Sequence, residues 1–454
     1  MRLRKLLDDL QTTLWFRPAV WVAGLGLLAL LLIAVDERYA GAESYTSIQW
    51  LPWVFTGGAD GARTMLGSIS ATALTVATLA YSVIMVAVVQ MANAFSPRIL
   101  RQYLADSGNQ HVLGILIGTF LFSLLVLRVV RSTNESSFVP AISVTVAIIL
   151  ALLSIVAFLY FLNRVAHSVE VRHVVHLIYK EGEELSDEIF PATLGKPWEG
   201  DHAPALPDGQ PAIIIAPSSG YVQFIAPDEL LSAVSKADVV VQLESLTGDY
   251  VLRNTPLATV WPAEGLDEHL TEAIQHAFQL GRERTAVQDL LFVIRQLNDI
   301  ALRALSPAVN DPTTAESCID ILGALLLKVA EQTPISPYRC DENGQLRVIA
   351  YGPTFEAMVD SAFNQIRHYA ANDLICTWRL IEVCGEIGYV ATQPDKQAVL
   401  WKHIRMVARS ADYNLSEPND RSEVNQRLVI AARLLNQDPR PILLDIEIPR
   451  SNRG

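Results

Sequence analysis

The stretch between Thr64 and Ser96 limits the possible folds of this chain more than any other feature, because it contains no Asp, Glu, Lys or Arg. An α-helix rises ~1.5 Å per residue, so ~20 predominantly apolar residues are enough to cross the hydrocarbon core of a bilayer. The uncharged stretch is longer than that. We therefore predict that residues 66–95 form a transmembrane helix.

The predicted helix carries a polar stripe along one face. At ~100° per residue, six hydroxyl or amide side chains fall within a sector of roughly 80°, with two apolar side chains between them. The stripe consists of Ser68, Thr72, Thr75, Leu79, Ser82, Val86, Gln90 and Asn93. The opposite face includes Ala73, Ala77 and Ile84, which suits lipid or a packed helix.

Two interpretations of this stripe remain open. Small and hydroxyl residues allow membrane helices to approach closely and to bond across the contact, so the stripe fits a packing surface. It also fits a water-lined pathway, in which Leu79 and Val86 form an apolar constriction that gates by dewetting. Gln90 and Asn93 favour the pathway, because amides cost more than hydroxyls in hydrocarbon and require a partner or water.

Three further apolar runs, 18–35, 112–130 and 139–162, predict a domain of four transmembrane helices over residues 1–162. The chain is 51% hydrophobic and 18% charged, which is more apolar than a soluble protein, and the excess lies in its first third. Basic residues precede the first span and acidic residues, Asp36 among them, follow it in the predicted outer loop. This asymmetry predicts that the N-terminus is cytoplasmic, and four spans return the C-terminus to the cytoplasm.

The charge and the motifs limit the expected partners. The net charge is −13, and no basic patch is interleaved with aromatic residues, so we expect no nucleic acid partner. The four cysteines lack a zinc-like spacing, and we predict no metal site. The sequence has no nucleophile elbow, no phosphate loop and no His-Glu-x-x-His, so we expect neither an enzyme nor a cofactor. The expected partners are the lipid bilayer, further copies of the chain, and a small ion or anion.

The rest of the chain predicts a cytosolic α+β part. Residues 163–211 are predicted to form a helical extension and a Pro- and Gly-rich linker. Residues 212–262 contain short β-branched runs separated by turn residues, which predict a small β-barrel or sandwich. Residues 263–454 are predicted to be helical, with one β-like insert at 346–351. The predicted helices are 266–280, 285–305, 313–331, 354–369, 374–387, 396–411 and 423–435.

The turn residues of the predicted β domain are Ser219-Gly220-Tyr221-Val222 and Gly248-Asp249-Tyr250-Val251. This pattern resembles the barrel-sandwich of biotinyl and lipoyl carrier domains and of membrane-fusion adaptors. The carrier lysine between the two halves is absent, since the region contains only Lys236. The resemblance therefore implies a structural or docking module rather than a swinging arm.

A polar corner joins two predicted helices of the C-terminal part. Its oxygen-bearing side chains belong to Ser306, Asn310, Asp311, Thr313 and Thr314. Asp311 before a proline is typical of an N-cap followed by proline at the first helical position, which predicts a tight helix–loop–helix corner. The same group could bind a small anion on the amides of the helix N-terminus. A hard cation is less favoured, because the corner contains one carboxylate.

Two motifs carry a wider resemblance. The first is Phe95-Ser96-Pro97-Arg98, after the second span, and the second is Arg-Ala-Leu-Ser-Pro-x-x-Asn-Asp-Pro-Thr-Thr-Ala, from Arg303 to Ala315. Both resemble a family of bacterial predicted inner-membrane proteins that is a domain of unknown function. The resemblance covers nearly the whole chain. It implies a multi-pass protein of the bacterial inner membrane with this architecture, and it implies no reaction.

These observations predict an oligomeric membrane protein. Four spans are few for one subunit to enclose a pathway, so a pore would form between subunits with the second span of each copy at the symmetry axis. The cytosolic part would then regulate the pore. The alternative is a membrane-anchored binding or assembly module, whose cytosolic β and helical domains dock a partner or sense a small ligand.

Overall fold

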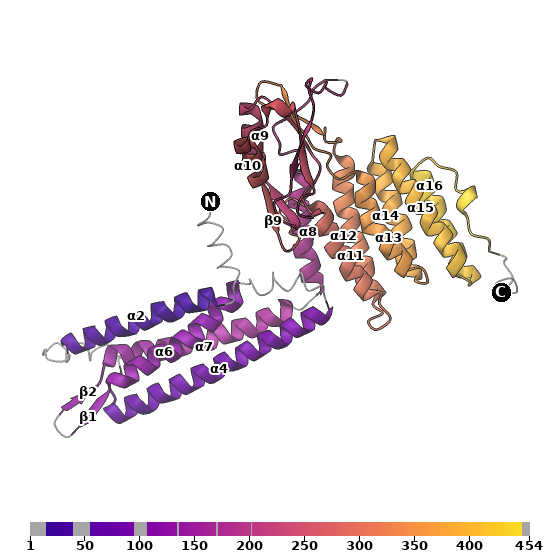
Figure 1. The fold of residues 1–454 in the computed structure, drawn as a ribbon. Coiled ribbons are helices and arrows are strands. Elements are labelled where there is room, and N and C mark those ends of the chain that lie inside the picture. Colours follow the sequence, from indigo (N-terminus) through magenta and orange to yellow (C-terminus); the bar gives the residue numbers. More distant parts are fainter. Residues whose placement is uncertain are drawn as a thin grey trace. The chain divides into compact units, whose positions relative to one another are not determined.

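The computed structural model describes residues 15–39, 55–94, 107–133, 136–168, 171–200 and 202–446. The chain divides into two compact units, residues 1–174 and residues 175–454, which we call the N-terminal and the C-terminal unit. Each has its own hydrophobic core. Figure 1 shows long helices in the first, and strands followed by further helices in the second.

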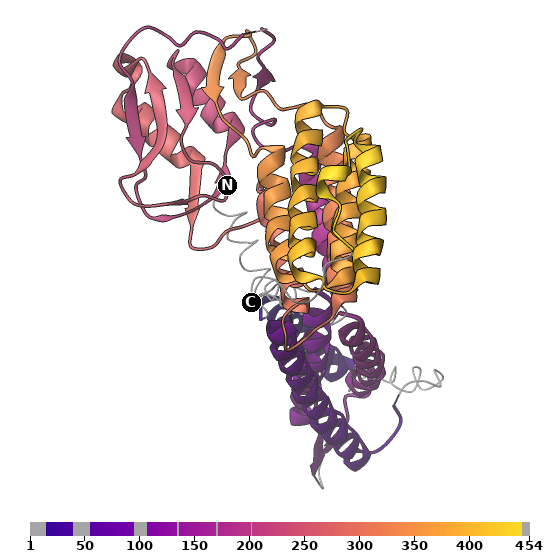
Figure 2. The ribbon, with the colours of Figure 1, turned by 90° about the vertical axis from the view of Figure 1, so that its right-hand side faces the viewer.

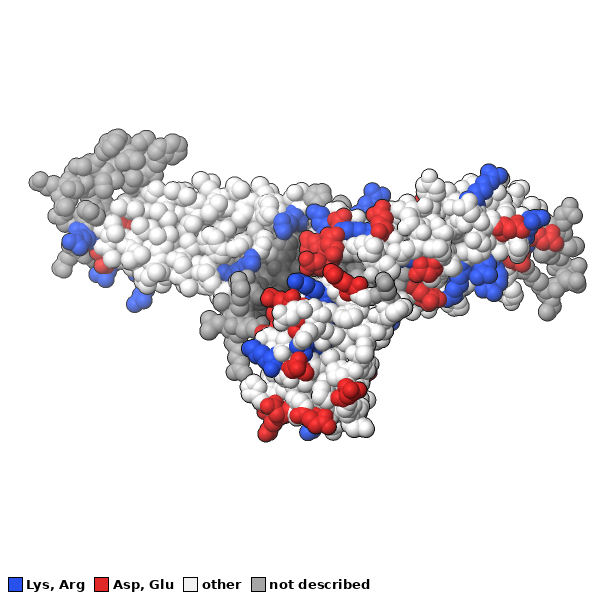
Figure 3. All heavy atoms as spheres, turned by 90° about the horizontal axis from the view of Figure 1, so that it is seen from above, with Lys and Arg blue, Asp and Glu red and all other residues white. Residues whose placement is uncertain are grey.

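The N-terminal unit consists of long helices and one short hairpin. Its helices are α2 (Phe16–Tyr39), α4 (Ala59–Ala94), α6 (Ser107–Val129) and α7 (Ala141–Ser168), and its strands are β1 (Arg131–Thr133) and β2 (Ser136–Phe138). All four helices are long and apolar enough to cross a membrane. Few charged atoms appear along this unit in Figure 3, whereas both signs of charge are spread over the C-terminal unit. The prediction of four apolar helices is therefore confirmed, with ends that differ by several residues.

Helix α6 is the centre of the N-terminal unit, because its contacts with α2, α4 and α7 are the most extensive in that unit. Two glycines at a spacing of four allow α2 to approach it closely. A Cβ atom on Gly114 would lie 2.7 Å from Trp21, and one on Gly118 would lie 2.5 Å from Leu25. Small residues four apart are a common means of packing membrane helices, and the sequence analysis did not identify this pair.

Asp36 connects the end of α2 to the start of α7. Its carboxylate accepts hydrogen bonds from the backbone amides of Ile142 (3.1 Å) and Ser143 (3.0 Å), and from the Ser143 hydroxyl (2.6 Å). The carboxylate therefore satisfies amides that a helix N-terminus leaves unpaired. Asp36 is fully buried and lies in the last turns of α2 rather than in the predicted outer loop.

Two β-sheets form the first part of the C-terminal unit. The larger has the strand order β3 (Lys196–Pro197), β10 (Tyr338–Cys340), β11 (Leu346–Ile349), β6 (Val240–Leu243), β8 (Pro256–Trp261) and β4 (Ala212–Ile215). The smaller has the order β7 (Tyr250–Val251), β5 (Gly220–Ile225) and β9 (Phe278–Gly281). Only β11 and β6 pair in parallel among these described strands. Figure 2 shows the orange strands alongside the earlier ones.

The prediction of a small β-barrel or sandwich in residues 212–262 holds only in part, because the described strands form two separate sheets and no closed barrel. Each described sheet has two end strands, and the larger one takes strands from outside that range. Helices α9 (Pro227–Lys236) and α10 (Glu268–Ala277) contribute Leu230, Val234 and Ile274 to the same core. The local pattern identified most strands but not the long-range partner of β6.

The second part of the C-terminal unit is helical. Its helices are α8 (Val171–Asp187), which begins just before the unit, then α11 (Leu290–Ala304), α12 (Pro312–Glu331), α13 (Phe355–Tyr369), α14 (Leu374–Val390), α15 (Pro394–Asn414) and α16 (Pro418–Leu434), and two 3₁₀ turns occur at Ala263–Gly265 and Arg440–Ile442. Their starts follow from capping chemistry. The side chains of Asp289, Asp311, Thr354 and Asp373 each accept the amide hydrogen three residues further on.

Helix α8 packs against α11 and α12 through a glycine. A Cβ atom on Gly182 would lie 2.9 Å from Val293 and 3.0 Å from Leu325. Lys328 of α12 donates to the carbonyl of Glu183 at 2.9 Å and forms an ion pair with Asp187 at 2.7 Å. Cations stabilise the C-terminal end of a helix, so these contacts hold the end of α8 in the bundle.

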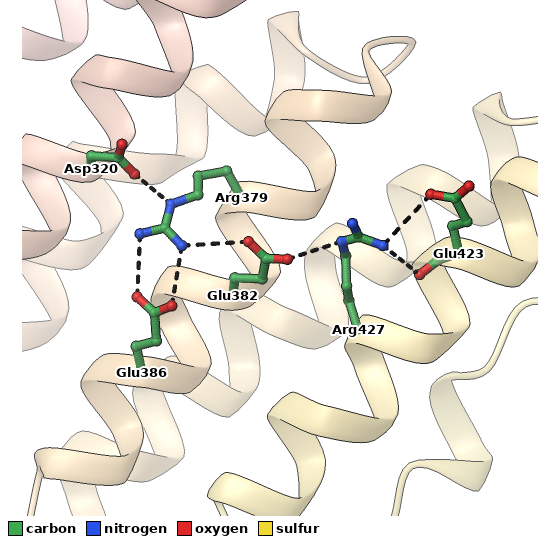
Figure 4. Close-up of polar contacts among 6 residues, drawn as sticks. All are labelled: Asp320, Arg379, Glu382, Glu386, Glu423 and Arg427. Carbon is green, nitrogen blue, oxygen red and sulfur yellow. Dashed lines mark hydrogen bonds and ion pairs between the residues drawn. The ribbon is translucent and has the colours of Figure 1, made fainter.

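An ion-pair network crosses three helices of the bundle (Figure 4). Arg379 of α14 contacts Asp320 of α12, and lies 3.1 Å from Glu386 and 3.4 Å from Glu382. Glu382 also pairs with Arg427 of α16 at 3.0 Å. Because these side chains are partly exposed, each pair contributes little, and the network mainly fixes the order of the helices.

Candidate functional site

The polar stripe of α4 faces away from the rest of its own unit. Ser68, Thr72, Thr75, Ser82 and Gln90 are all exposed in the single chain. The two apolar members of the stripe are exposed as well, Leu79 by 52% and Val86 by 62%. The Asn93 side chain lies outside those that the structure describes.

The opposite face of α4 packs inside the unit. Its buried residues are Ala73, Ala77, Ala80, Ile84 and Ala87. Small side chains on this face let α4 lie close to α6 and α7, which it contacts. Packing within one chain therefore uses the apolar face, and the polar face is left for water, lipid or another chain.

Two hydroxyl groups of the stripe bond to their own helix. Thr75 donates to the carbonyl of Ala71 at 2.8 Å, and Ser82 donates to the carbonyl of Thr78 at 2.9 Å. Such bonds from a hydroxyl to the carbonyl four residues earlier satisfy the donor without any outside partner. These two hydroxyls are therefore tolerated in hydrocarbon, whereas the exposed amide of Gln90 has no such bond among the described contacts.

A groove of about 290 Å³ opens beside the first half of the stripe. Ser68 and Thr72 of α4 line one side of it, and α6 and α7 form the rest. Most of its lining is apolar, but Thr119 of α6 and Ser154 of α7 share a buried hydrogen bond of 3.1 Å within it. The groove can hold an apolar chain or a side chain from a neighbouring helix.

The predicted corner is a compact turn whose polar groups serve the fold. The Asp311 carboxylate accepts hydrogen bonds from the Thr314 amide (3.1 Å) and the Thr314 hydroxyl (2.6 Å). The Ser306 hydroxyl donates to the carbonyl of Arg303 at 2.7 Å, and Asn310 has a positive φ of 50°. Thr313 is exposed at the start of α12. The Asp311 carboxylate therefore already accepts the Thr314 amide, which an anion at this helix N-terminus would need.

Three polar residues before and at the start of α11 join the sheet to the bundle. Arg284 forms a bidentate ion pair with Asp289, with N···O distances of 2.6 and 3.0 Å. Asp289 is also the N-cap of α11. Burial raises the pKa of the Asp289 carboxyl above its usual value, and Arg284 opposes this shift. The neighbouring Gln288 amide bonds to both backbone groups of Ile225, at 2.9 and 3.1 Å. These contacts stabilise the fold. The Phe95–Arg98 motif of the sequence analysis lies outside the described residues.

Sequence reasoning missed a polar cluster inside the bundle. His403 of α15 contacts the Asp360 carboxylate of α13 at 2.9 Å, and Asn364 donates to the same oxygen at 3.0 Å. Asn298 of α11 donates to the carbonyl of Ser361 at 2.6 Å. Burial lowers the pKa of His403, and Asp360 opposes that shift. The signal for this cluster was polar residues on the packed faces of amphipathic helices.

Comparisons with known proteins place the chain among uncharacterised membrane proteins. Residues 11–386 match the family described as "Predicted membrane protein (DUF2254)". The uncharacterized proteins Rv1290c of Mycobacterium tuberculosis (strain ATCC 25618 / H37Rv) and Mb1321c of Mycobacterium bovis are each 30% identical to it over 449 residues, covering 97% of this chain and 83% of theirs. No solved structure matches this chain. Because the family match covers most of the chain, this protein belongs to the DUF2254 family of predicted membrane proteins.

Proposed function

We propose that several copies of this protein assemble in the bacterial plasma membrane, with both termini in the cytoplasm, and enclose a pathway for small ions between their α4 helices. The observation that carries this proposal is the outward-facing polar stripe of α4 (Ser68, Thr72, Thr75, Ser82 and Gln90) in a single chain. Polar side chains at membrane depth generally face a protein interior or water rather than lipid. A ring of identical stripes around a symmetry axis provides such an environment.

The stripe has the chemistry of a gated pathway. Hydroxyl and amide groups offer hydrogen bonds to water or to a partly hydrated ion, without fixed charge. Leu79 and Val86 are the exposed apolar residues of the stripe, and they lie seven positions apart in the sequence. A ring of such side chains closes a pore by excluding water. The C-terminal unit then regulates opening.

Cysteine accessibility in reconstituted vesicles tests the pathway. Thr75→Cys and Ser82→Cys probe the stripe, Leu74→Cys probes an exposed position off the stripe, and Ala77→Cys probes the packed face. A water-soluble thiol reagent should modify the two stripe cysteines at least tenfold faster than the other two. Background labelling is low, because all four native cysteines are buried, and burial raises the pKa of Cys318 and Cys384 to about 12.

Ion flux through vesicles that contain the purified protein provides the second test. Val86→Ser replaces an apolar group of the constriction by a hydroxyl, so we expect a several-fold faster flux than in the unaltered protein. Leu74→Ser makes a similar change off the stripe and should leave the flux unchanged. Equal labelling of all four engineered cysteines, together with no flux from Val86→Ser, would rule the pathway out.

A second function is favoured by one observation, the bonds from Thr75 and Ser82 to their own helix. Because these hydroxyls need no water, the stripe also fits a dry contact between copies, in a protein whose C-terminal unit docks a partner. Under this alternative, the engineered stripe cysteines form disulfide-linked dimers but resist the water-soluble reagent. Gln90→Leu then leaves the partner complex intact, whereas it abolishes flux if the pathway exists.

A further inference from the structure

A cavity of about 410 Å³ lies between α15 and the segment that follows α16. Its lining consists of Lys402, Arg405, Ala408, Arg409 and Asp412 of α15, with Pro441, Ile442 and Leu443 opposite. The volume is in the range of pockets that hold small ligands, ~300–1,000 Å³. The cavity belongs wholly to the C-terminal unit and is distinct from the α4 stripe.

The charges around this cavity leave an excess of positive charge. Lys402 pairs with Glu356 at 2.7 Å, and Asp412 pairs with the buried Arg421. Arg405 and Arg409 are exposed, and no described carboxylate lies within ion-pair distance of either guanidinium. The cavity is therefore locally positive in a chain whose net charge is −13.

Polar side chains of α16 hold the far wall of the cavity in place. The Asn425 side chain of α16 forms two hydrogen bonds to the backbone of Leu444, at 2.8 and 2.7 Å. Arg421, which is 3% exposed, donates to the backbone carbonyls of Asp412 (2.9 Å) and Leu415 (2.8 Å) and also contacts the carbonyl of Asp445. The wall is therefore fixed by the fold rather than by contacts of exposed side chains.

We propose that this cavity binds a phosphate group, with Arg405 and Arg409 as its ligands. Residues four apart on a helix lie ~5–6 Å from each other at their Cβ atoms, so both guanidinium groups reach one phosphate. Each guanidinium presents a planar fork that matches two phosphate oxygens. Ile442 and Leu443 supply an apolar surface for the body of the ligand. The phosphate belongs either to a soluble phosphate ester or to the headgroup of a phospholipid.

Calorimetric titration of the full-length protein in neutral detergent tests this proposal with two probes. Pyrophosphate represents a soluble ligand, and a short-chain phosphatidylglycerol represents a headgroup, with phosphatidylcholine of equal chain length as its neutral control. At least one anionic probe should bind, and R405Q/R409Q should raise its Kd at least tenfold. The probe that binds more tightly identifies the source of the phosphate.

Two further variants separate the site from general charge effects. R282Q/R295Q removes the same charge from two exposed arginines that do not line the cavity, and it should leave Kd unchanged. R405K/R409K keeps the positive charge but removes the planar guanidinium groups that bind phosphate in a bidentate manner. Its Kd should therefore lie between those of the unaltered protein and R405Q/R409Q. The proposal is wrong if neither probe binds, or if R282Q/R295Q weakens binding as much as R405Q/R409Q does.

Discussion

At the residue scale, Asp36 shows how one carboxylate connects two apolar helices. It is fully buried and caps α7 through two amides and one hydroxyl. Asp36→Ala should lower the stability of the protein in detergent by about 1–2 kcal/mol, because the amides of Ile142 and Ser143 lose their partner. Thermal unfolding measures this change. Glu37→Ala removes the exposed neighbouring carboxylate and should have almost no effect; an equal loss in both variants would contradict the capping role.

His403 makes the stability of the bundle depend on pH. Burial lowers its pKa in the folded protein, Asp360 opposes the shift, and Lys402 and Arg367 add to it. The unfolded chain therefore takes up a proton first as the pH falls, with a linked change of at most ~1.4 kcal/mol per pH unit. The stability is fully present above about pH 6.5 and is lost as the pH falls through the folded value.

The corresponding variant is His403→Gln. It should be less stable than the unaltered protein at pH 7.5, and its unfolding midpoint should depend less on pH between 5 and 7. Thermal unfolding at several pH values measures both effects. His269→Gln changes an exposed histidine and should retain the original dependence. If the two variants have the same pH profile, another group is responsible.

At the element scale, the close contact between α2 and α6 depends on glycines of α6, which have no side chain. A Cβ atom on Gly118 would lie 2.5 Å from Cδ1 of Leu25, so either that side chain or one of the two helices would have to move. Gly118→Val should therefore destabilise the N-terminal unit by about 1–3 kcal/mol through overpacking. The unfolding midpoint in detergent and the yield of folded protein both report this loss.

Gly24 provides the matched control for Gly118, because a Cβ atom there would meet nothing within 4 Å. Gly24→Ala should be neutral or slightly stabilising, since alanine favours the helix by up to ~1 kcal/mol over glycine. If Gly118→Val is tolerated as well as Gly24→Ala, α2 and α6 do not approach closely in the membrane.

At the scale of the whole molecule, the N-terminal unit requires a membrane or detergent, whereas we expect the C-terminal unit to be stable in water. The N-terminal unit exposes apolar helices, whereas the C-terminal unit has a buried core under a charged surface. A fragment from Val171 to the C-terminus should therefore be soluble without detergent and should unfold cooperatively in urea. Circular dichroism and gel filtration measure this behaviour. Aggregation of the fragment would mean that its fold depends on the first 170 residues.

The sequence allowed prediction of elements whose signal is local. The four spans follow from long apolar runs, and helices such as α12 follow from an N-cap and a proline at the first helical position. Helix α9 was missed between two strand-like runs, although Pro227 and two acidic residues mark its start. The phosphate cavity could not be predicted, because its wall comes from residues beyond α16.

The candidate stripe followed from periodicity, whereas its surroundings did not. An angular pattern places Ser68 and Ser82 on one face of α4, and the structure leaves that face exposed in the single chain. The groove beside it depends on Thr119 and Ser154, which belong to two other helices. The choice of neighbouring helices depends on how they pack, as the glycines of α6 show. The sequence pattern of α4 alone does not contain this information.

The late position of β11 in the sequence has a consequence for the nascent chain during translation. Its parallel partner β6 leaves the ribosome about a hundred residues earlier, and helices α11 and α12 are made in between. At ~5–20 residues per second, one side of β6 stays without its neighbour for roughly 5–20 s of translation. An uncovered strand edge is a template for association with other chains. Nascent chains that stall before residue 346 should therefore be the aggregation-prone species of this protein and the ones that need a chaperone.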